Sequence, residues 1–156
     1  MPITKTQTSD AALGDRGLSP AVEKVILDFA TGLPGFPDEH RFVLEDLGPQ
    51  LEPFCRMRSI EHPEICFTVI PPGVIVADYS VEIDLESVER LGLESAEDAI
   101  ILAIVTLAVA PEPPKLNLLG PIVVNRHTRA AAQVVQHGSD YGVAVPLVAP
   151  GAGSAA

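Results

Sequence analysis

The stretch that most constrains the fold is residues 99–125, AIILAIVTLAVAPEPPKLNLLGPIVVN. It contains two apolar runs, Ile100–Val109 and Leu116–Val124, separated by the proline-rich segment Pro111–Pro114. Proline cannot continue a helix or a central strand, so this break is a connection. The first run is rich in β-branched residues, which suit a buried strand. Its residues 99–110 are too few to span a membrane, because a spanning helix needs about 18 to 20. We therefore predict two core strands.

The composition predicts one folded domain with an acidic surface. The chain has 156 residues, 47% of them hydrophobic, and a formal net charge of −11. This length supports a single core, and the apolar content is too high for a disordered chain. The negative charge repels nucleic acid and anionic lipid and favours basic protein partners, so we expect binding to neither nucleic acid nor membranes. The N-terminal residues lack the apolar core of a secretory signal, and the expected location is therefore the cytoplasm.

Loose ends are expected to flank this domain. Residues 1–20 mix Thr, Ser, Gly and Asp without a period, which predicts a disordered N-terminal tail. One ordered domain is expected over residues 21–148, followed by a disordered C-terminal tail over residues 149–156.

Short strands with frequent turn signals dominate the rest of the chain. This pattern is typical of a mainly β fold, and we predict a small antiparallel β-barrel-like or sandwich domain with one or two short helices. Besides the two core strands, strands are expected at Val22–Phe29, His40–Leu47, Phe54–Ile60, Ile65–Ile70, Val74–Ala77, Tyr79–Ile83, Ala131–Gln136 and Gly142–Val148.

The clearest helix is predicted between Asp84 and Leu91. Asp84 can cap its start, apolar residues recur on one face, and Gly92 can end it in a left-handed conformation. Ser95 and Asp98 have the spacing of a capping box, which predicts one further helical turn before the central strand.

The two cysteines are predicted to be free. If the hairpin between the strands at 54–60 and 65–70 turns near His62, Cys55 lies opposite Val69 and Cys66 lies opposite Arg58. The two thiols are then out of register and too far apart for a disulfide. Their spacing also matches no zinc signature, so we expect two free, half-buried thiols and no metal site.

Catalytic patterns are weak in this sequence. The segment His137–Asp140 contains the residue types of a hydrolase triad, but neighbours in a turn rarely face one another at hydrogen-bonding distance. The glycines near residues 32–35 lack the lysine and helix of a phosphate-binding loop. We therefore expect a protein that is not an enzyme and that carries no cofactor.

Acidic residues are concentrated around the predicted helix. Between Val81 and Ala99 there are seven acids and one base, Arg90. A solvated outer face explains any one of these acids, but the group as a whole suits a basic protein partner. The candidate protein-binding residues are Glu86, Glu89, Glu94, Glu97 and Asp98.

Several motifs together resemble the FliW family of flagellar assembly factors, over about residues 22–148. They are TGLPGF at 31–36, SIEHPEICFTVIPP at 59–72, the Asp78-Tyr79 pair, LGLESAEDAIILAIVTL at 91–107, NLLGPIVVN at 117–125 and QVVQHGSDYGVAVPL at 133–147. The chain departs from the family pattern at Cys55 and Arg56, where many members carry aromatic or bulky apolar residues.

The resemblance implies a cytoplasmic protein, monomeric when free, that binds flagellin and the basic translational repressor CsrA. In such proteins flagellin occupies the factor while it is plentiful, and its export frees the factor to bind CsrA. This relieves repression of flagellin translation without competition for the RNA groove. A flagellin chaperone without a translational role is the first alternative. A small-ligand enzyme in a barrel mouth is the second, but we find no convergent titratable groups for it.

Overall fold

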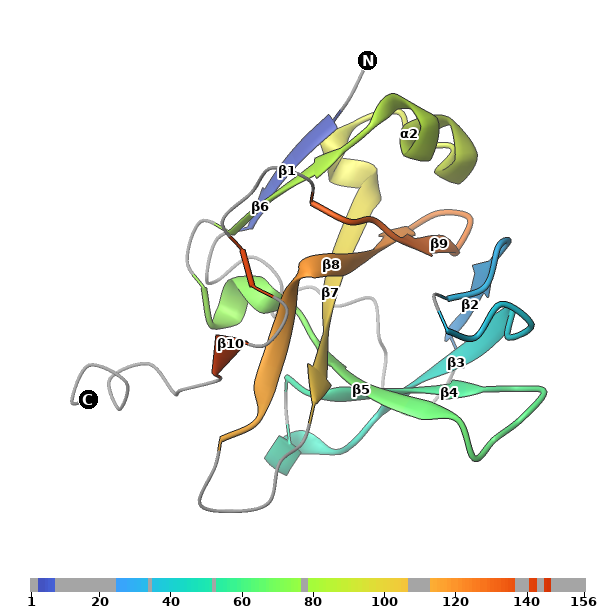
Figure 1. The fold of residues 1–156 in the computed structure, drawn as a ribbon, viewed down its shortest axis with the longest axis vertical. Helices are drawn as coiled ribbons and strands as arrows, with labels where there is room; N and C mark the ends of the chain where they lie inside the picture. The colour runs from blue at the N-terminus through green and yellow to red at the C-terminus, as the bar shows by residue number, and fades with distance from the viewer. Residues whose placement is uncertain are drawn as a thin grey trace.

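The computed structural model describes residues 3–7, 25–33, 35–51, 53–76, 79–106, 113–136, 141–142 and 145–146. Seven of its strands form a closed barrel (Figure 1). They are β2 (Val25–Phe29), β3 (Arg41–Asp46), β4 (Cys55–Ser59), β5 (Cys66–Ile70), β7 (Ala99–Thr106), β8 (Lys115–Asn125) and β9 (Ala130–Gln133). The order β8-β7-β5-β4-β3-β2-β9 returns to β8 through the β8–β9 pairing. The mainly β class is confirmed, and the architecture is a barrel.

The two apolar runs of the opening stretch become the longest strands, β7 and β8. They pair antiparallel from Ala99↔Asn125 to Thr106↔Lys115, with an irregularity between Leu102 and Ile104. Most barrel pairings are antiparallel, as expected, but β2 and β9 run parallel where the barrel closes. The proline-rich connection lies mostly outside the described residues.

Alternation along these strands divides the apolar side chains between two cores. On β7, Leu102 faces the barrel interior, whereas Ile101 and Ala103 face outward. The barrel core comprises Val25, Leu27, Phe29, Leu33, Phe42, Cys55, Met57, Val69, Leu102, Ile122, Val124 and Ala131. The outer core comprises Ile70, Tyr79, Val81, Ile83, Val88, Leu91, Leu93, Ala99, Ile101, Ala103, Val105, Leu116, Leu118, Val123, Ala132 and Val134.

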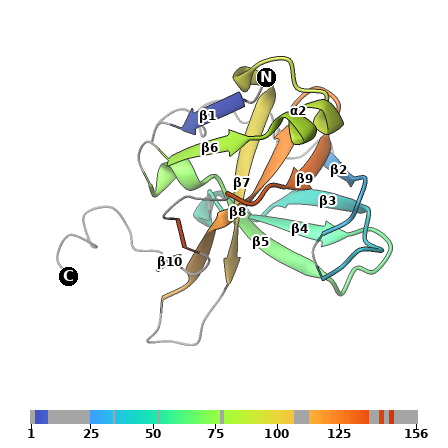
Figure 2. The ribbon, with the colours of Figure 1, turned by 45° about the horizontal axis from the view of Figure 1, so that its top comes forward.

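An outer layer covers the second core. It contains the antiparallel pair β1 (Ile3–Gln7) and β6 (Tyr79–Ile83), the helix α2 (Leu85–Leu91) and the short 3₁₀ helix η3 (Ala96–Asp98). In Figures 1 and 2 this layer lies at one end of the molecule, above the barrel strands β3, β4 and β5. The remaining short elements are η1 (Pro49–Leu51), η2 (Pro72–Val74) and β10 (Val145–Pro146).

The structure corrects the expected N-terminal tail at residues 3–7. These residues form β1, in register with β6 from Ile3↔Ile83 to Gln7↔Tyr79. β-Branched Thr4 and Thr6 suit a strand, but the edge that receives it is supplied by residues far away in the sequence, which local pattern does not show. Residues 8–20 and 149–156, where loose tails were also expected, lie outside the described residues.

A second correction concerns the strand expected at Val74–Ala77. Pro72 opens the 3₁₀ helix η2 instead, and the N–H of Val76 donates to the carbonyl of Pro72 at 2.8 Å. A proline near the start of a helical turn is favourable because its missing N–H has no partner there anyway. Ala77 lies outside the described residues.

The ends of the predicted strands also shift. The strand predicted over Ala131–Gln136 is observed as β9 over Ala130–Gln133, and residues 134–136 follow it without strand structure. Of the strand predicted over Gly142–Val148, Val145–Pro146 forms β10. The segment His137–Asp140 lies outside the described residues.

The cysteine register is as predicted. Cys55 lies opposite Val69, and Cys66 lies opposite Arg58. The two cysteines do not form a disulfide with each other, as predicted, but neither is half-buried, because Cys55 faces the barrel core and Cys66 is exposed. Within the described part of the chain, no helix is long and apolar enough to cross a membrane.

The loop between β2 and β3 closes one end of the barrel with aromatic side chains. Phe36 packs edge-on against Phe67 at 5.6 Å between ring centroids, and Phe67 in turn contacts Phe42 of the barrel core at 6.1 Å. Gly32 permits this turn. Its φ is +71°, and a Cβ at this position would lie 2.6 Å from the carbonyl oxygen of Pro37.

Candidate functional site

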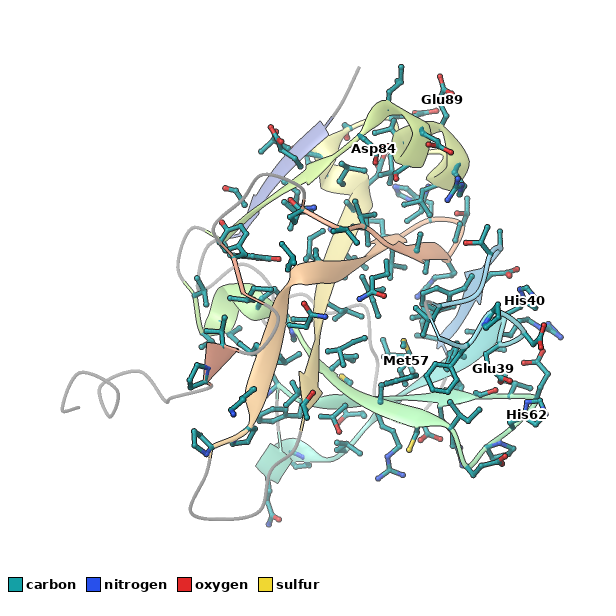
Figure 3. All side chains as sticks on the ribbon, in the orientation of Figure 1. Glu39, His40, Met57, His62, Asp84 and Glu89 are labelled. Carbon is teal, nitrogen blue, oxygen red and sulfur yellow. The ribbon has the colours of Figure 1, made fainter. Side chains whose placement is uncertain are left out.

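The five predicted protein-binding acids all lie in the outer layer. We define this acidic surface as Glu86, Glu89, Glu94, Glu97 and Asp98. They come from α2, from the link after it and from η3. The four glutamates are exposed, and Asp98 is half-buried. Figure 3 shows Glu89 at the end of the molecule opposite Glu39 and His62.

Helix α2 is positioned by its apolar face. Val88 and Leu91 are buried in the outer core, which leaves Glu86 and Glu89 on the solvent side. Asp84 occupies the N-cap position with extended backbone, and hydrogen bonding to Ser87 lowers the pKa of its carboxyl. Gly92 ends the helix with φ 69°. The predicted helix and its glycine end are therefore confirmed, and Asp84 stands at the N-cap position without a capping hydrogen bond from its side chain.

Asp98 organises the backbone of η3. Its carboxylate accepts hydrogen bonds from the N–H groups of Glu94 at 2.9 Å and Ser95 at 3.1 Å, which confirms the predicted capping box. Its other oxygen lies 3.0 Å from Nε2 of His127. The N–H of Glu94 is the main cause that lowers the pKa of Asp98. Asp98 thus holds the surface together and is less available to a partner.

Asn125 is a positioning residue that the sequence reasoning missed. Its side-chain amide donates to the carbonyls of Leu91 at 2.8 Å and Gly92 at 3.2 Å. Its oxygen accepts from the N–H groups of His127 at 2.8 Å and Thr128 at 3.2 Å. Asn125 is buried, and so it joins the end of α2 to the turn after β8. The sequence could have indicated this role, because Asn125 ends the apolar motif NLLGPIVVN, and a polar side chain buried there needs hydrogen-bond partners.

Neighbouring side chains already engage part of the acidic surface. Glu86 pairs with Arg90 at 2.8 Å, and His127 lies beside Asp98. Lys5 of β1 interacts electrostatically with Glu97, although burial, followed by repulsion from Arg126, lowers the pKa of Lys5 overall. Within the described ranges, Glu89 and Glu94 make no side-chain ion pair. They are therefore the acids most available to a basic partner.

A separate polar cluster around one carboxylate, that of Glu39, lies beside the barrel. Buried Glu39 accepts a hydrogen bond from the hydroxyl of Ser59, and its other oxygen lies 2.6 Å from Nδ1 of His62. The Ser59 bond is the main cause that lowers the pKa of Glu39. In a hydrolase triad the histidine stands between the hydroxyl and the carboxylate, whereas here the carboxylate stands between the other two. This arrangement ties loop to strand and does not activate a nucleophile.

The structure adds no metal centre among the residues it describes. No three described His, Cys, Asp or Glu side chains gather in a way that could hold an ion. The segment His137–Asp140, which contains the residue types of a hydrolase triad, lies outside the described residues.

Comparisons with known proteins agree on one family. Residues 15–147 match the family model described as FliW protein. The flagellar assembly factor FliW of Bacillus licheniformis is 40% identical over 119 residues, which is 76% of this chain and 82% of that protein. The protein of the same name from Geobacter sulfurreducens is 39% identical over 123 residues, covering 78% of this chain and 76% of the relative.

A solved structure supports the same conclusion at the level of the fold. The crystal structure of a flagellar assembly factor FliW superposes with a TM-score of 0.73 and 30% identity, covering 78% of this chain and 84% of that one. Sequence, fold and length therefore agree, and the chain belongs to the FliW family.

Proposed function

We propose that this protein is a cytoplasmic flagellar assembly factor that acts by binding flagellin and the translational repressor CsrA, without catalysis. Membership of a family whose relatives are named flagellar assembly factors supports the role in flagellar assembly.

The observation that carries the CsrA proposal is the exposed acidic surface beside the outer core. Glu89 and Glu94 have no side-chain ion pair among the described residues, and the chain as a whole carries a net charge of −11. An acidic surface of this kind attracts a basic protein and speeds its encounter. Bound next to the repressor, it also weakens the attraction of RNA phosphate nearby, so repression can be relieved without occupying the RNA groove.

The two partners are proposed to alternate. While flagellin is abundant it occupies the assembly factor, and CsrA remains free to repress flagellin translation. Export of flagellin releases the factor, which then binds CsrA and lifts the repression. Flagellin synthesis is thereby matched to flagellin export.

Charge reversal tests the proposed surface. The triple variant Glu89→Lys, Glu94→Lys and Glu97→Lys is expected to weaken the binding of purified CsrA at least 10-fold, about 1.4 kcal/mol. Isothermal titration calorimetry measures this at low salt and again at high salt, where screening should reduce the difference.

The matched control reverses three exposed acids at other places, Asp28→Lys, Glu61→Lys and Glu64→Lys. It changes the net charge equally, so it separates a local contact from a general field effect. Equal losses of affinity in both triple variants would contradict a binding site on the acidic surface.

A flagellin chaperone without a translational role is the alternative. It is favoured by apolar side chains exposed on the barrel side, namely Ile26 (40% exposed), Phe36 (37%) and Ile60 (40%). Titrating the protein with CsrA alone distinguishes the two functions, because a chaperone confined to flagellin does not bind the repressor.

A further inference from the structure

Strand β6 has two edges, and they are covered in different ways. One edge pairs with β1 over five residues, from Tyr79↔Gln7 to Ile83↔Ile3. On the other edge the backbone groups of Ser80 and Glu82 point away from β1. Edges of this kind are places where a further strand can be added.

Side chains, and not a strand, cover this second edge. The N–H of Glu82 donates to Oε1 of Gln136 at 2.7 Å, and Nε2 of Gln136 donates back to the Glu82 carbonyl at 3.0 Å. The N–H of Ser80 donates to the hydroxyl of Tyr141 at 3.0 Å. The amide of Gln136 therefore takes the position of a peptide group in a neighbouring strand. Gln136 is buried, so water does not readily replace it.

The backbone that carries these side chains is anchored elsewhere, on β8. The N–H of Val134 donates to Pro121 at 2.9 Å, and the N–H of Gln136 donates to Leu119 at 2.7 Å. Farther along, the carbonyl of Gly142 accepts from the N–H of Leu118 at 2.9 Å. Opening of the β6 edge to a strand therefore requires both side chains to leave Ser80 and Glu82 and the backbone that carries them to move away from β6.

We propose that the outer edge of β6 is a strand-accepting site, held closed by Gln136 and Tyr141, for an extended basic segment of a partner protein. An incoming antiparallel strand replaces the bonds that the two side chains make to Ser80 and Glu82. Because peptide groups supply these bonds, the site recognises extended backbone. The acidic side chains around the edge then favour a basic sequence.

The charge around the edge favours a basic segment over a second copy of this chain. The side chain of Glu82 is exposed on β6, and Asp84, Glu86 and Glu89 follow it on the way into α2. Two copies that paired edge to edge would bring these carboxylates together, and each copy carries a net charge of −11. Like charges opposite one another destabilise a pair of strands, whereas lysine or arginine opposite Glu82 stabilises it.

The test compares Gln136→Ala with Gln133→Ala in the full chain. Gln133 is a matched control, because its amide donates to the Gly120 carbonyl of β8 at 2.8 Å and not to the backbone of Glu82. The probe is a capped heptapeptide of alternating threonine, lysine and valine, and an equivalent peptide with glutamate in place of lysine is the charge control. We expect Gln136→Ala to bind the lysine peptide about 10-fold more tightly than wild type, and Gln133→Ala to match wild type.

Amide hydrogen exchange locates the event. In Gln136→Ala the N–H of Glu82 should exchange faster than in wild type, and the lysine peptide should restore its protection. Tyr141→Phe removes the hydroxyl bond to Ser80 and keeps the ring, and so it provides a milder opening if Gln136→Ala does not fold. Unchanged exchange of Ser80 and Glu82 in both variants, equal affinity for the glutamate peptide, or dimerisation of Gln136→Ala through this edge would each overturn the proposal.

Discussion

The barrel and the outer layer are held together by different kinds of interaction. The barrel core consists of fully buried apolar side chains such as Phe29, Phe42 and Met57, enclosed by a closed ring of strand pairings. The outer layer buries apolar side chains against the outer face of the barrel strands, and individual polar groups attach it in addition. The hydroxyl of Tyr79 donates to the carbonyl of Leu118 at 2.6 Å, and Asn125 joins the end of α2 to the turn after β8.

This difference separates folding from recognition. A closed barrel has no free edge and loses its packing only when the whole ring opens, so its stability is cooperative. In the part of the chain that the structure describes, the outer layer has no such closed ring of strand pairings, so parts of it can open locally at lower cost. The candidate surfaces, namely the acidic surface and the covered edge of β6, both lie in that layer. Changes to the barrel should therefore alter global stability, whereas changes to the outer layer should alter local exchange and binding.

The largest effect is expected from a cavity in the barrel. Met57→Ala removes a fully buried side chain from the barrel core and should lower the free energy of unfolding by about 3 kcal/mol. Urea denaturation followed by circular dichroism measures this loss. Amide exchange should accelerate in barrel and outer layer alike, because the barrel opens as one unit. Faster exchange confined to the neighbours of Met57 would contradict a cooperative barrel.

Asn125→Ala should have the next largest effect, about 2 kcal/mol, because four backbone groups lose their partner in a buried place. The loss should be concentrated in the outer layer, with faster amide exchange at His127 and Thr128 and at the end of α2. Asn117→Ala is the matched control on the same strand, since its side chain accepts only from Leu119 and Gly120 nearby. If both variants accelerate exchange in α2 equally, Asn125 does not attach the layer.

Local patterns in the sequence predicted several structural features of both regions. The turn near His62 set the pairing of Cys55 with Val69, and Asp84 and Gly92 marked both ends of α2. Each of these signals depends on residues close together in the chain. The pairing of β1 with β6, the parallel closure of β2 on β9 and the contacts of Asn125 join residues far apart, and no local period encodes them.

The same limit applied to the acidic surface. The sequence identified its five acids by their density, and the structure places all of them in the outer layer. It could not tell which of them are already engaged. His127 contacts Asp98 from the turn after β8, and Lys5 of β1 interacts electrostatically with Glu97, so both partners come from segments distant in sequence. Partner binding by the acidic surface stays a prediction.

A smaller effect is expected on the pH dependence of stability, and it can be compared between Glu39 beside the barrel and Asp98 in the outer layer. Hydrogen bonds from Ser59 and from the N–H of Glu94 hold the pKa of Glu39 and that of Asp98, respectively, below the ordinary value. A lowered pKa in the folded state means that stability is gained above the unfolded pKa and is lost as pH falls through the folded one.

Between pH 7 and pH 4, the free energy of unfolding should therefore fall less in Glu39→Gln and in Asp98→Asn than in wild type. Urea denaturation at pH 7, 5 and 4 measures this. Faster amide exchange should spread through the barrel in the first variant and stay near η3 in the second. Glu64→Gln, an exposed acid in the β4–β5 hairpin, is the control and should keep the wild-type pH dependence. A wild-type pH dependence in Glu39→Gln as well would show that its hydrogen bonds do not affect acid stability.

The smallest effect is expected on the acidic surface itself. Glu86→Gln removes one member of the exposed i,i+4 pair with Arg90 and should cost only about 0.3 kcal/mol of folding stability. Glu89→Gln, which breaks no ion pair among the described residues, should be neutral within the error of urea denaturation. Acids that the fold does not need can vary or serve a partner without affecting the barrel. A loss above 1 kcal/mol in Glu89→Gln would mean that this acid supports the fold, and it would weaken the separation between a barrel that folds and a layer that binds.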